Sequence, residues 1–246
     1  MSITKEKWLN KTFHWKYKWT QFPPEVEDDS NGISLYKIVQ ILNKNLKNDS
    51  AVIADAGSCG YVLAQSLQLK NNQRYILDSG QMSLGAWPMS IGVSLAKNKG
   101  HTILCVGDGS FNTNNSALAT IKYHKLPIVI LAWNNLGYLS IRNTAKSFYE
   151  GRLIGTDSKN GLYFPNIEKI ANTYEIDYLK IDTIKELQDK IDFLMNIESP
   201  IIVEIKCDPN QKIVPNLAMK NGKACPLHDL TPFLSDEEME REMIKD

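Results

Sequence analysis

Four short segments rich in glycine and small or polar residues each follow a run of apolar residues, and together they have the chemistry of a phosphate-binding site. They are residues 57–60, 80–85, 107–110 and 134–137. Glycines let backbone N–H groups approach a phosphate closely, and a helix N-terminus after such a loop favours negative charge. We therefore expect these segments to hold a phosphorylated ligand.

Two of these segments also carry oxygen groups that suit a divalent cation. Asp108, between Gly107 and Gly109, offers a carboxylate, and Asn135 offers a neutral side-chain oxygen. Hard oxygen ligands of this kind, completed by water and phosphate oxygens, suit Mg²⁺. A lone Gly-Asp-Gly is most often a turn, so the prediction rests on the order and spacing of both segments.

The elements that must position these residues alternate between strands and helices. Apolar runs predict buried strands at 51–56, 74–79, 101–108, 128–134, 177–181 and 200–207. Helices are expected at 60–68, 88–98, 114–124, 166–174 and 183–196. Near-continuous apolar strands separated by helices indicate an α/β fold: a doubly wound, mostly parallel sheet of about six strands with helices on both faces. Ligands of such sheets bind beyond the carboxyl ends of the strands, where the four segments lie.

Composition excludes several classes of protein. Of the 246 residues, 43% are hydrophobic, and 28 Lys and Arg balance 28 Asp and Glu, so no overall charge favours nucleic acid or an anionic membrane. No apolar window reaches the roughly 18 residues of a membrane span, and the N-terminus has no signal-peptide core. The four cysteines form no CxxC pair, which argues against zinc ribbons and iron–sulfur clusters. A cytoplasmic location is the simplest expectation.

The chain is expected to have three parts: an aromatic arm and linker at 1–31, the α/β domain at 32–210, and a tail with a helix at 211–246. Trp8, Trp15 and Trp19 stand among lysines in the arm, which either packs on its own domain or docks on another chain. The sequence SDEEMEREMIKD near the end predicts a capped, solvated terminal helix.

The spacing of two motifs leads to a family resemblance. Gly107-Asp108-Gly109 is followed by 24 residues and then by Asn134-Asn135, which resembles the signature of enzymes that bind thiamine diphosphate. The resemblance extends over nearly the whole chain, including NGISLYKIVQILNKNL, DAGSCGYV, SIGVSLAKNKG and KLPIVILAWNNLGYLSIR. The chain resembles the C-terminal diphosphate-binding domain of acetolactate-synthase-like enzymes, which makes 32–210 the expected thiamine diphosphate-binding domain.

This resemblance implies the residues that bind thiamine diphosphate and Mg²⁺. The implied metal ligands are the side chains of Asp108 and Asn135 and the carbonyl of Gly137. The implied diphosphate-binding residues are Ala56, Gly57, Ser58, Cys59, Gly109 and Ser110. The segment with Gln81, Met82 and Leu84 would lie under the aminopyrimidine ring, and Gly107 and Tyr138 complete the cofactor-binding set.

The resemblance also implies that no catalytic residue lies in this chain. In the family, a Glu from a pyrimidine-binding domain of another subunit activates the cofactor, and no acidic residue here fits that role. A separate pyrimidine-binding subunit is therefore the expected partner. Apolar residues of the carboxyl-end loops indicate an interface and a homo-oligomer. They are Tyr61, Met82, Leu84, Trp87, Leu136, Tyr138 and Leu139.

We expect a subunit that decarboxylates a pyruvate-like 2-oxo acid and transfers the fragment to an acceptor, as acetolactate synthases do, and that is inactive without its partner. Two alternatives stay open: a β-type subunit of a simple 2-oxo acid decarboxylase of the sulfopyruvate or phosphonopyruvate type, and a non-catalytic cofactor-binding module. A fragment of a longer enzyme is also possible. The missing CxxC cluster argues against an oxoacid–ferredoxin oxidoreductase β subunit.

Three further residues have two readings each. Cys59 at a helix N-terminus could have a lowered pKa, although a small residue tolerated in a tight turn is the simpler interpretation. Arg142 and Arg152 lie in the segment 140–163, for which the sequence indicates mobility. Both arginines could grip a substrate carboxylate or could lie on the surface.

Overall fold

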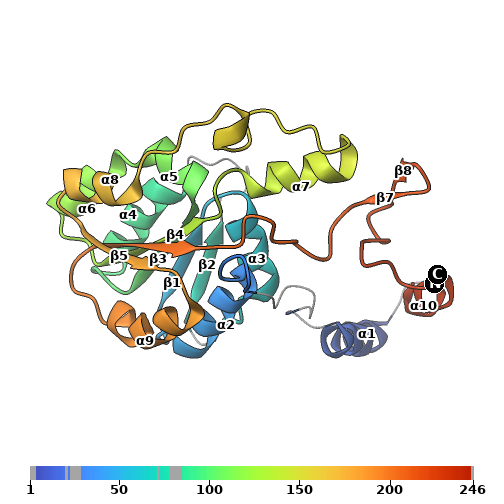
Figure 1. Cartoon of the computed structure of the whole chain (residues 1–246). Helices are drawn as coiled ribbons and strands as arrows, with labels where there is room; N and C mark the ends of the chain where they lie inside the picture. The colour runs from blue at the N-terminus through green and yellow to red at the C-terminus, as the bar shows by residue number, and fades with distance from the viewer. Residues whose placement is uncertain (1–3, 20–21, 23–28, 71, 78–84, 245–246) are drawn as a thin grey trace. The chain divides into compact units, whose positions relative to one another are not determined.

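The computed structural model of the chain describes residues 4–19, 22, 29–70, 72–77 and 85–244 (Figure 1). These residues form two compact units. One combines the two ends of the chain, Met1–Pro24 and Ile213–Asp246, and the other is Glu25–Lys212. The division into 1–31, 32–210 and 211–246 stays a prediction. No helix among the described residues is long and apolar enough to cross a membrane.

A six-stranded sheet forms the centre of the larger unit (Figure 1). Its strands are β1 (Ala51–Ala54), β2 (Arg74–Leu77), β3 (Thr102–Gly107), β4 (Ile128–Asn134), β5 (Asp177–Ile181) and β6 (Ile201–Lys206). All neighbours pair in parallel, in the order β2-β1-β3-β4-β6-β5. The predicted α/β fold with about six parallel strands is confirmed, and each predicted apolar run contains one of these strands.

Helices cover both faces of this sheet. The helices are α2 (Leu35–Asn45), α3 (Ser58–Ser66), α4 (Ala86–Ala96), α5 (Asp108–Asn114), α6 (Ala117–Tyr123), α7 (Leu139–Phe148), α8 (Ile167–Thr173) and α9 (Ile184–Met195). Helix α2 packs against α3 and α9 on one face, whereas α4 packs against α6 on the other (Figure 1). The segment 140–163, for which the sequence indicates mobility, contains most of α7 and the 3-10 helix η2 (Ser158–Asn160).

The order of the strands reverses its direction between β1 and β3. The chain winds from β1 outwards to β2 and then returns to β3 on the opposite side of β1. Such a reversal is the point at which open α/β sheets bind ligands. Gly57 follows β1 and Asp108 follows β3, so the topology brings two of the predicted segments to this point of reversal.

Two residues that were expected at an exposed interface lie in the core instead. Trp87 has no exposed surface because its ring packs edge to face against Phe111, at a centroid distance of 5.4 Å. Leu139 is buried on the inner side of α7. The expectation that these two side chains are exposed is wrong. Tyr61 and Leu136 are exposed, and Met82 and Leu84 lie outside the described residues.

The smaller unit contains the helices α1 (Lys5–Lys18) and α10 (Asp236–Glu242) and the short strands β7 (Met219–Lys220) and β8 (Lys223–Ala224). Glu242 of α10 is only 5% exposed and accepts hydrogen bonds from Lys11 at 2.8 Å, Trp15 at 3.0 Å and Lys18 at 2.6 Å. The sequence predicts a solvated terminal helix. In the structure one side of α1 packs on α10, so this helix is not fully solvated. The Ser235 hydroxyl caps α10 by accepting from the N–H of Glu238.

Candidate functional site

Three loops at the carboxyl ends of β1, β3 and β4 converge on one site. A Cβ atom placed on Gly57, after β1, would lie 3.5 Å from the hydroxyl of Ser140 in α7. A Cβ atom on Gly109, after β3, would overlap the ring of Tyr138, which follows β4. The loops after β1 and β3 therefore both adjoin the segment that follows β4, and glycine at position 109 allows the close approach of Tyr138.

Asp108 lies at the centre of these loops. Its side chain is buried, with one carboxylate oxygen accepting from the N–H of Gly109 at 2.8 Å and the other from the N–H of Gly137 at 2.7 Å. A carboxylate has about four lone-pair positions, so these two bonds leave the carboxylate able to ligate a cation. The structure thus joins Asp108 to Gly137, two of the three predicted metal ligands.

The electrostatic environment of Asp108 also fits a bound cation. Burial raises the pKa of Asp108 to about 6, although the N–H groups of Gly137 and Gly109 and the positive charge of Arg142 act in the opposite direction. The ionised carboxylate is therefore incompletely stabilised by the protein around it. A divalent cation at this point would supply the missing positive charge and restore the ionised form at neutral pH.

Asn135 supplies a second oxygen with unused bonding capacity. The side chain is 2% exposed, and its oxygen Oδ1 has no hydrogen-bond partner among the described residues. A buried polar atom without a partner is costly and points to an absent ligand or water. The Gly137 carbonyl accepts from the N–H of Leu139 at 3.0 Å and retains a second lone pair. The three oxygen groups therefore fit Mg²⁺.

The turn after β4 has a backbone shape that few residues can adopt. Leu136 has a φ of +61° and Gly137 a φ of +137°. A Cβ atom on Gly137 would overlap the carbonyl oxygen of Thr156, so only glycine fits there. Asn134 helps to shape this turn because its Oδ1 accepts from the N–H of Leu136 at 3.1 Å. The two asparagines thus differ in role: Asn134 forms the turn, and Asn135 leaves its oxygen unpaired.

The loop after β1 is less open to a diphosphate than the resemblance implies. Gly57 has a φ of +98° and precedes α3. The N–H of Ala56 donates to Asp55 at 3.0 Å and is therefore already used. Cys59 points into the protein, where its thiol donates to the carbonyl of Asp55, and burial raises its pKa to about 12. Of the two readings of Cys59, the less favoured one, a lowered pKa, is wrong because desolvation outweighs the helix N-terminus.

The remaining predicted residues divide into two groups. Gly107 directly precedes α5. Ser110 lies in the first turn of α5, two residues after Asp108, and is buried. Gln81, Met82 and Leu84 lie outside the described residues, so the predicted position of the aminopyrimidine ring stays a prediction.

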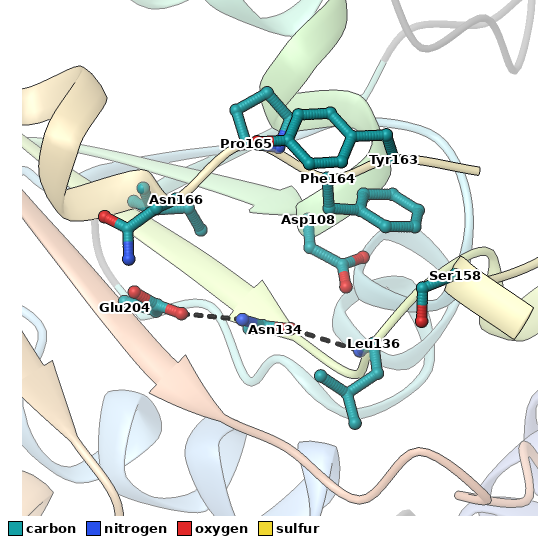
Figure 2. A pocket seen from close by; sticks show the side chains of 10 residues that line it. Asp108, Asn134, Leu136, Ser158, Tyr163, Phe164, Pro165, Asn166 and Glu204 are labelled. Carbon is teal, nitrogen blue, oxygen red and sulfur yellow. Dashed lines mark hydrogen bonds between the residues drawn. The ribbon is translucent and has the colours of Figure 1, made fainter.

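A pocket of about 440 Å³ borders Asp108 (Figure 2). Its wall is formed by residues of β4 and the turn after it, of β6, of the starts of α5 and α8, of η2 and of the segment before α8. They are Asp108, Asn134, Leu136, Ser158, Tyr163, Phe164, Pro165, Asn166, Ile167 and Glu204. Glu204 accepts from Asn134 at 2.6 Å and from the hydroxyl of Tyr178. Sequence reasoning missed Glu204, although an acidic residue inside the apolar run of β6 is a signal for a buried polar contact.

Arg142 has a different role from the two that the sequence allows. Its side chain is 5% exposed, and its guanidinium group donates to the backbone carbonyls of Asn135 at 2.8 Å and Pro209 at 2.9 Å. It also donates to the carbonyls of Leu136 and Thr156. Arg142 is therefore neither a surface residue nor open to a substrate carboxylate. Arg152 is exposed.

A comparison with protein families agrees with this site. Residues 55–205, more than half of the chain, match the family described as thiamine pyrophosphate enzyme, C-terminal TPP binding domain. The matched residues include Gly57, Asp108 and Asn135. The chain belongs to this family. The resemblance drawn from the motifs is thereby confirmed, and the chain contains a thiamine diphosphate-binding domain of acetolactate-synthase-like enzymes.

Similar proteins of known function are longer than this family member. It is 26% identical over 197 residues to the acetolactate synthase large subunit of Lactococcus lactis subsp. lactis (strain IL1403), covering 78% of this chain and 33% of that protein. The acetolactate synthase large subunit of Buchnera aphidicola subsp. Schizaphis graminum (strain Sg) is 28% identical over 221 residues, covering 87% and 38%. The chain thus spans little more than a third of the length of these relatives.

A solved structure shares the fold of the domain. The thiamine diphosphate-dependent 4-hydroxybenzoylformate decarboxylase of Rhodococcus jostii RHA1 superposes with a TM-score of 0.66 at 20% identity. The match covers 75% of this chain and 34% of that chain. At this identity the likeness supports the fold and carries no conclusion about the substrate.

Proposed function

We propose that this thiamine diphosphate-binding domain supplies the Mg²⁺–diphosphate half of an acetolactate-synthase-like active site. Asp108, Asn135 and the carbonyl of Gly137 would hold Mg²⁺. The observation that carries the proposal is the unpartnered, buried Oδ1 of Asn135, two residues before the glycine whose N–H binds Asp108. Two buried oxygen groups with unused lone pairs, at the carboxyl ends of the neighbouring strands β3 and β4, favour a hard cation over a purely structural role.

The residues of this chain would bind and orient the cofactor rather than react with it. When bound, thiamine diphosphate supplies the nucleophilic carbon and the electron sink that allow a 2-oxo acid to lose CO₂. The backbone N–H groups from Gly57 to Cys59 and the hydroxyl of Ser110 would donate to the diphosphate. The N–H groups of Ala56 and Gly109 already donate to Asp55 and Asp108, so these two residues would shape the loops beside it. Tyr138 lies over Gly109 and contacts Phe164 edge to face at 6.1 Å, and these rings would exclude water from the loop after β3.

The other half of the active site would come from outside this domain. About two thirds of the length of the acetolactate synthase relatives lies beyond the matched region. We propose that a separate pyrimidine-binding subunit provides the activating Glu, in an oligomeric assembly in the cytoplasm. The names of the relatives support transfer of a fragment from a pyruvate-like 2-oxo acid to an acceptor. Simple decarboxylation and a non-catalytic binding module are the alternatives, and the experiment below distinguishes them.

The proposal is tested by replacing the unpartnered amide with an apolar group of similar size. Asn135→Leu should lose Mg²⁺-dependent binding of thiamine diphosphate, measured by isothermal titration calorimetry, while its melting temperature stays equal or rises. The melting temperature should not fall because no hydrogen bond within the described residues is lost at Oδ1. Asn172→Leu, at an exposed position in α8, is the matched control and should bind as wild type does.

The outcomes of this titration separate the alternatives. Unchanged binding by Asn135→Leu would show that the cation site lies elsewhere. Mg²⁺-dependent binding by the wild type that is lost in the variant supports the proposed site, and assays with a pyrimidine-binding subunit then distinguish the three activities. Product with a second carbon chain indicates carboligation, an aldehyde alone indicates simple decarboxylation, and no turnover indicates the binding module.

A further inference from the structure

The side chain of Arg142 joins three separate segments at the carboxyl edge of the sheet. One nitrogen, Nη2, donates to the carbonyls of Asn135 and Pro209, and the other, Nη1, donates to those of Leu136 at 3.2 Å and Thr156 at 3.4 Å. These carbonyls come from the turn after β4, the segment after α7 and the segment after β6. Arg142 is therefore a connection between segments that are far apart in the sequence.

Burial of this cation has a cost that the structure does not offset with an ion pair. Among the described residues, no carboxylate lies within ion-pair distance of the Arg142 side chain, which is 5% exposed. Desolvation of a charge is unfavourable unless its hydrogen-bonding groups are satisfied. Here the planar fork of donors matches four convergent carbonyl oxygens, an arrangement that a lysine ammonium cannot reproduce.

The carbonyls that Arg142 holds belong to the turn with the least favourable backbone. Leu136 has a left-handed φ of +61°, which is disfavoured for a residue with a Cβ atom, and Gly137 follows at +137°. Strained conformations persist where surrounding contacts over-determine them. Arg142 contacts the carbonyls of Asn135 and Leu136, and the resulting turn directs the N–H of Gly137 to Asp108 at 2.7 Å.

A second contact fixes the same turn from the side of Thr156. The Thr156 carbonyl accepts from the N–H of Tyr138 at 2.8 Å as well as from Arg142. The turn is thus attached at residues 135, 136 and 138, on both sides of Gly137. The carbonyl of Gly137 receives no bond from Arg142, and the side chain of Asn135 is left unpaired.

We propose that Arg142 is a positioning residue for the cation site. It holds the turn 135–137 so that the Asn135 amide and the Gly137 carbonyl face the same cation as the Asp108 carboxylate. The inference rests on the proposed function, because the cation is the one proposed there. Arg142 does not touch the cation, and both of its Nη nitrogens are already engaged, so it offers no two-pronged grip for a substrate carboxylate.

The test compares Arg142→Lys, which keeps the charge but loses the fork, with Arg152→Met, an exposed control in the segment after α7. Calorimetry measures the binding of pyrophosphate in the presence of Mg²⁺, and hydrogen exchange measures the protection of the Gly137 amide without ligand. We expect Arg142→Lys to bind about 10–100-fold more weakly, as is typical when a partner of a metal ligand is lost. We also expect full stoichiometry at saturation and faster exchange at Gly137, and no change in Arg152→Met.

Binding by Arg142→Lys within twofold of wild type, with unchanged Gly137 protection, would overturn the inference. Asp108→Asn is measured in parallel. If Asp108→Asn also binds as wild type, the proposed function fails; if Asp108→Asn loses binding and Arg142→Lys does not, the positioning role alone fails.

A measurement on the wild-type chain keeps the test decisive if Arg142→Lys does not fold. In a chain labelled with ¹⁵N-arginine, four fixed hydrogen bonds should hinder rotation of the Arg142 guanidinium and give separate Nη–H signals. These signals should shift when Mg²⁺ and pyrophosphate are added, whereas those of Arg152 should stay averaged. Averaged Arg142 signals that do not shift would contradict the positioning role.

Discussion

The carboxylate of Asp108 accepts a 2.7 Å hydrogen bond from the N–H of Gly137, 29 residues further along the chain. This contact joins the loop that follows β3 to the turn that follows β4, which are neighbouring parallel strands. The two parts of the Gly-Asp-Gly and Asn-Asn motif are thus held together by the protein itself. Ligand binding at this site would use an arrangement that already exists in the cofactor-free chain.

The first prediction concerns the glycine in this contact. Gly137→Ala should destabilise the cofactor-free chain by about 2–3 kcal/mol, because a Cβ atom would overlap the Thr156 carbonyl at a φ of +137°. Gly107→Ala is the control: nothing lies within 4 Å of its Cβ position, so we expect a change within about 0.5 kcal/mol. Chemical denaturation measures both, and equal stability of the two variants would refute the described turn.

The second prediction is that Asp108 makes the cofactor-free chain less stable as the pH rises, and that Asp108→Asn removes this pH dependence. Burial raises the pKa of Asp108 to about 6 in the folded state, above the value of 3.8 for an unperturbed Asp. The folded state thus binds the proton more tightly, and the contribution of Asp108 to stability falls as the pH rises from about 4 to 6. Relative to Asp108→Asn, we expect the wild type to lose on the order of 1–3 kcal/mol of stability between pH 4 and pH 7.

The comparison is of pH dependence and not of absolute stability, because an amide can accept only one of the two N–H bonds that the carboxylate accepts from Gly109 and Gly137. Thermal melts of both chains from pH 4 to pH 7 measure it. A stability difference that does not change over this range would show that the carboxylate is well stabilised without a cation.

Much of the fold and of the motif arrangement could be predicted from the sequence. Every predicted strand is present. The four inner strands β1, β3, β4 and β6 are largely buried and therefore apolar, so their runs are plain in the sequence, and the more exposed edge strands β2 and β5 still keep a short apolar run. Asp108 and Asn135 could be placed together because the carboxyl ends of neighbouring parallel strands share an edge. Their burial and the unpaired Oδ1 of Asn135 follow from packing and could not be read from the spacing.

The residues that sequence reasoning placed wrongly depend on contacts between distant segments. Arg142 looks like a surface residue of a polar segment, and only the convergence of carbonyls as distant as Pro209 makes its burial possible. Cys59 lies in the first turn of α3, but its thiol points to the carbonyl of Asp55. Trp87 stands beside a glycine-rich loop, yet Phe111 buries it.

The third prediction concerns the smaller unit. Hydrogen bonds from Lys11, Lys18 and His14 hold the pKa of Glu242 well below its usual range. A depressed pKa means that Glu242 stabilises the contact of α1 with α10 above about pH 4.5 and loses this contribution as the pH falls below that value. Glu242→Gln should therefore loosen α1 at neutral pH.

Tryptophan fluorescence checks this contact, because the indole N–H of Trp15 donates to Glu242 at 3.0 Å. We expect the emission of Glu242→Gln at pH 7 to lie to the red of wild type. Glu237→Gln, at an exposed position in the same helix, is the control and should match wild type. Identical spectra for all three chains would mean that the contact does not order α1 in solution.

The fourth prediction is that the purified chain alone does not decarboxylate pyruvate. Glu204, the glutamate among the residues that line the pocket, is occupied by hydrogen bonds to Asn134 and Tyr178. The activating Glu should therefore come from a pyrimidine-binding subunit, whose addition should restore release of CO₂. Steady turnover by the isolated chain, with Asp108→Asn inactive as the check for contaminants, would contradict the proposed division of the active site.

The measurement that tests the central claim most directly is calorimetric titration of pyrophosphate into the chain, with and without Mg²⁺. Pyrophosphate is the suitable probe because it contains the diphosphate and no pyrimidine ring. Asp108→Asn removes one charge at constant shape, and Asp182→Asn makes the same change after β5, away from the site.

The account predicts one pyrophosphate-binding site that requires Mg²⁺ and is retained in Asp182→Asn. In Asp108→Asn the affinity should fall by more than about 100-fold, which exceeds the effect of losing a residue that only supports a metal ligand. Binding that is independent of Mg²⁺, or equal in Asp108→Asn and wild type, would contradict the claim that Asp108 holds the cation for the diphosphate.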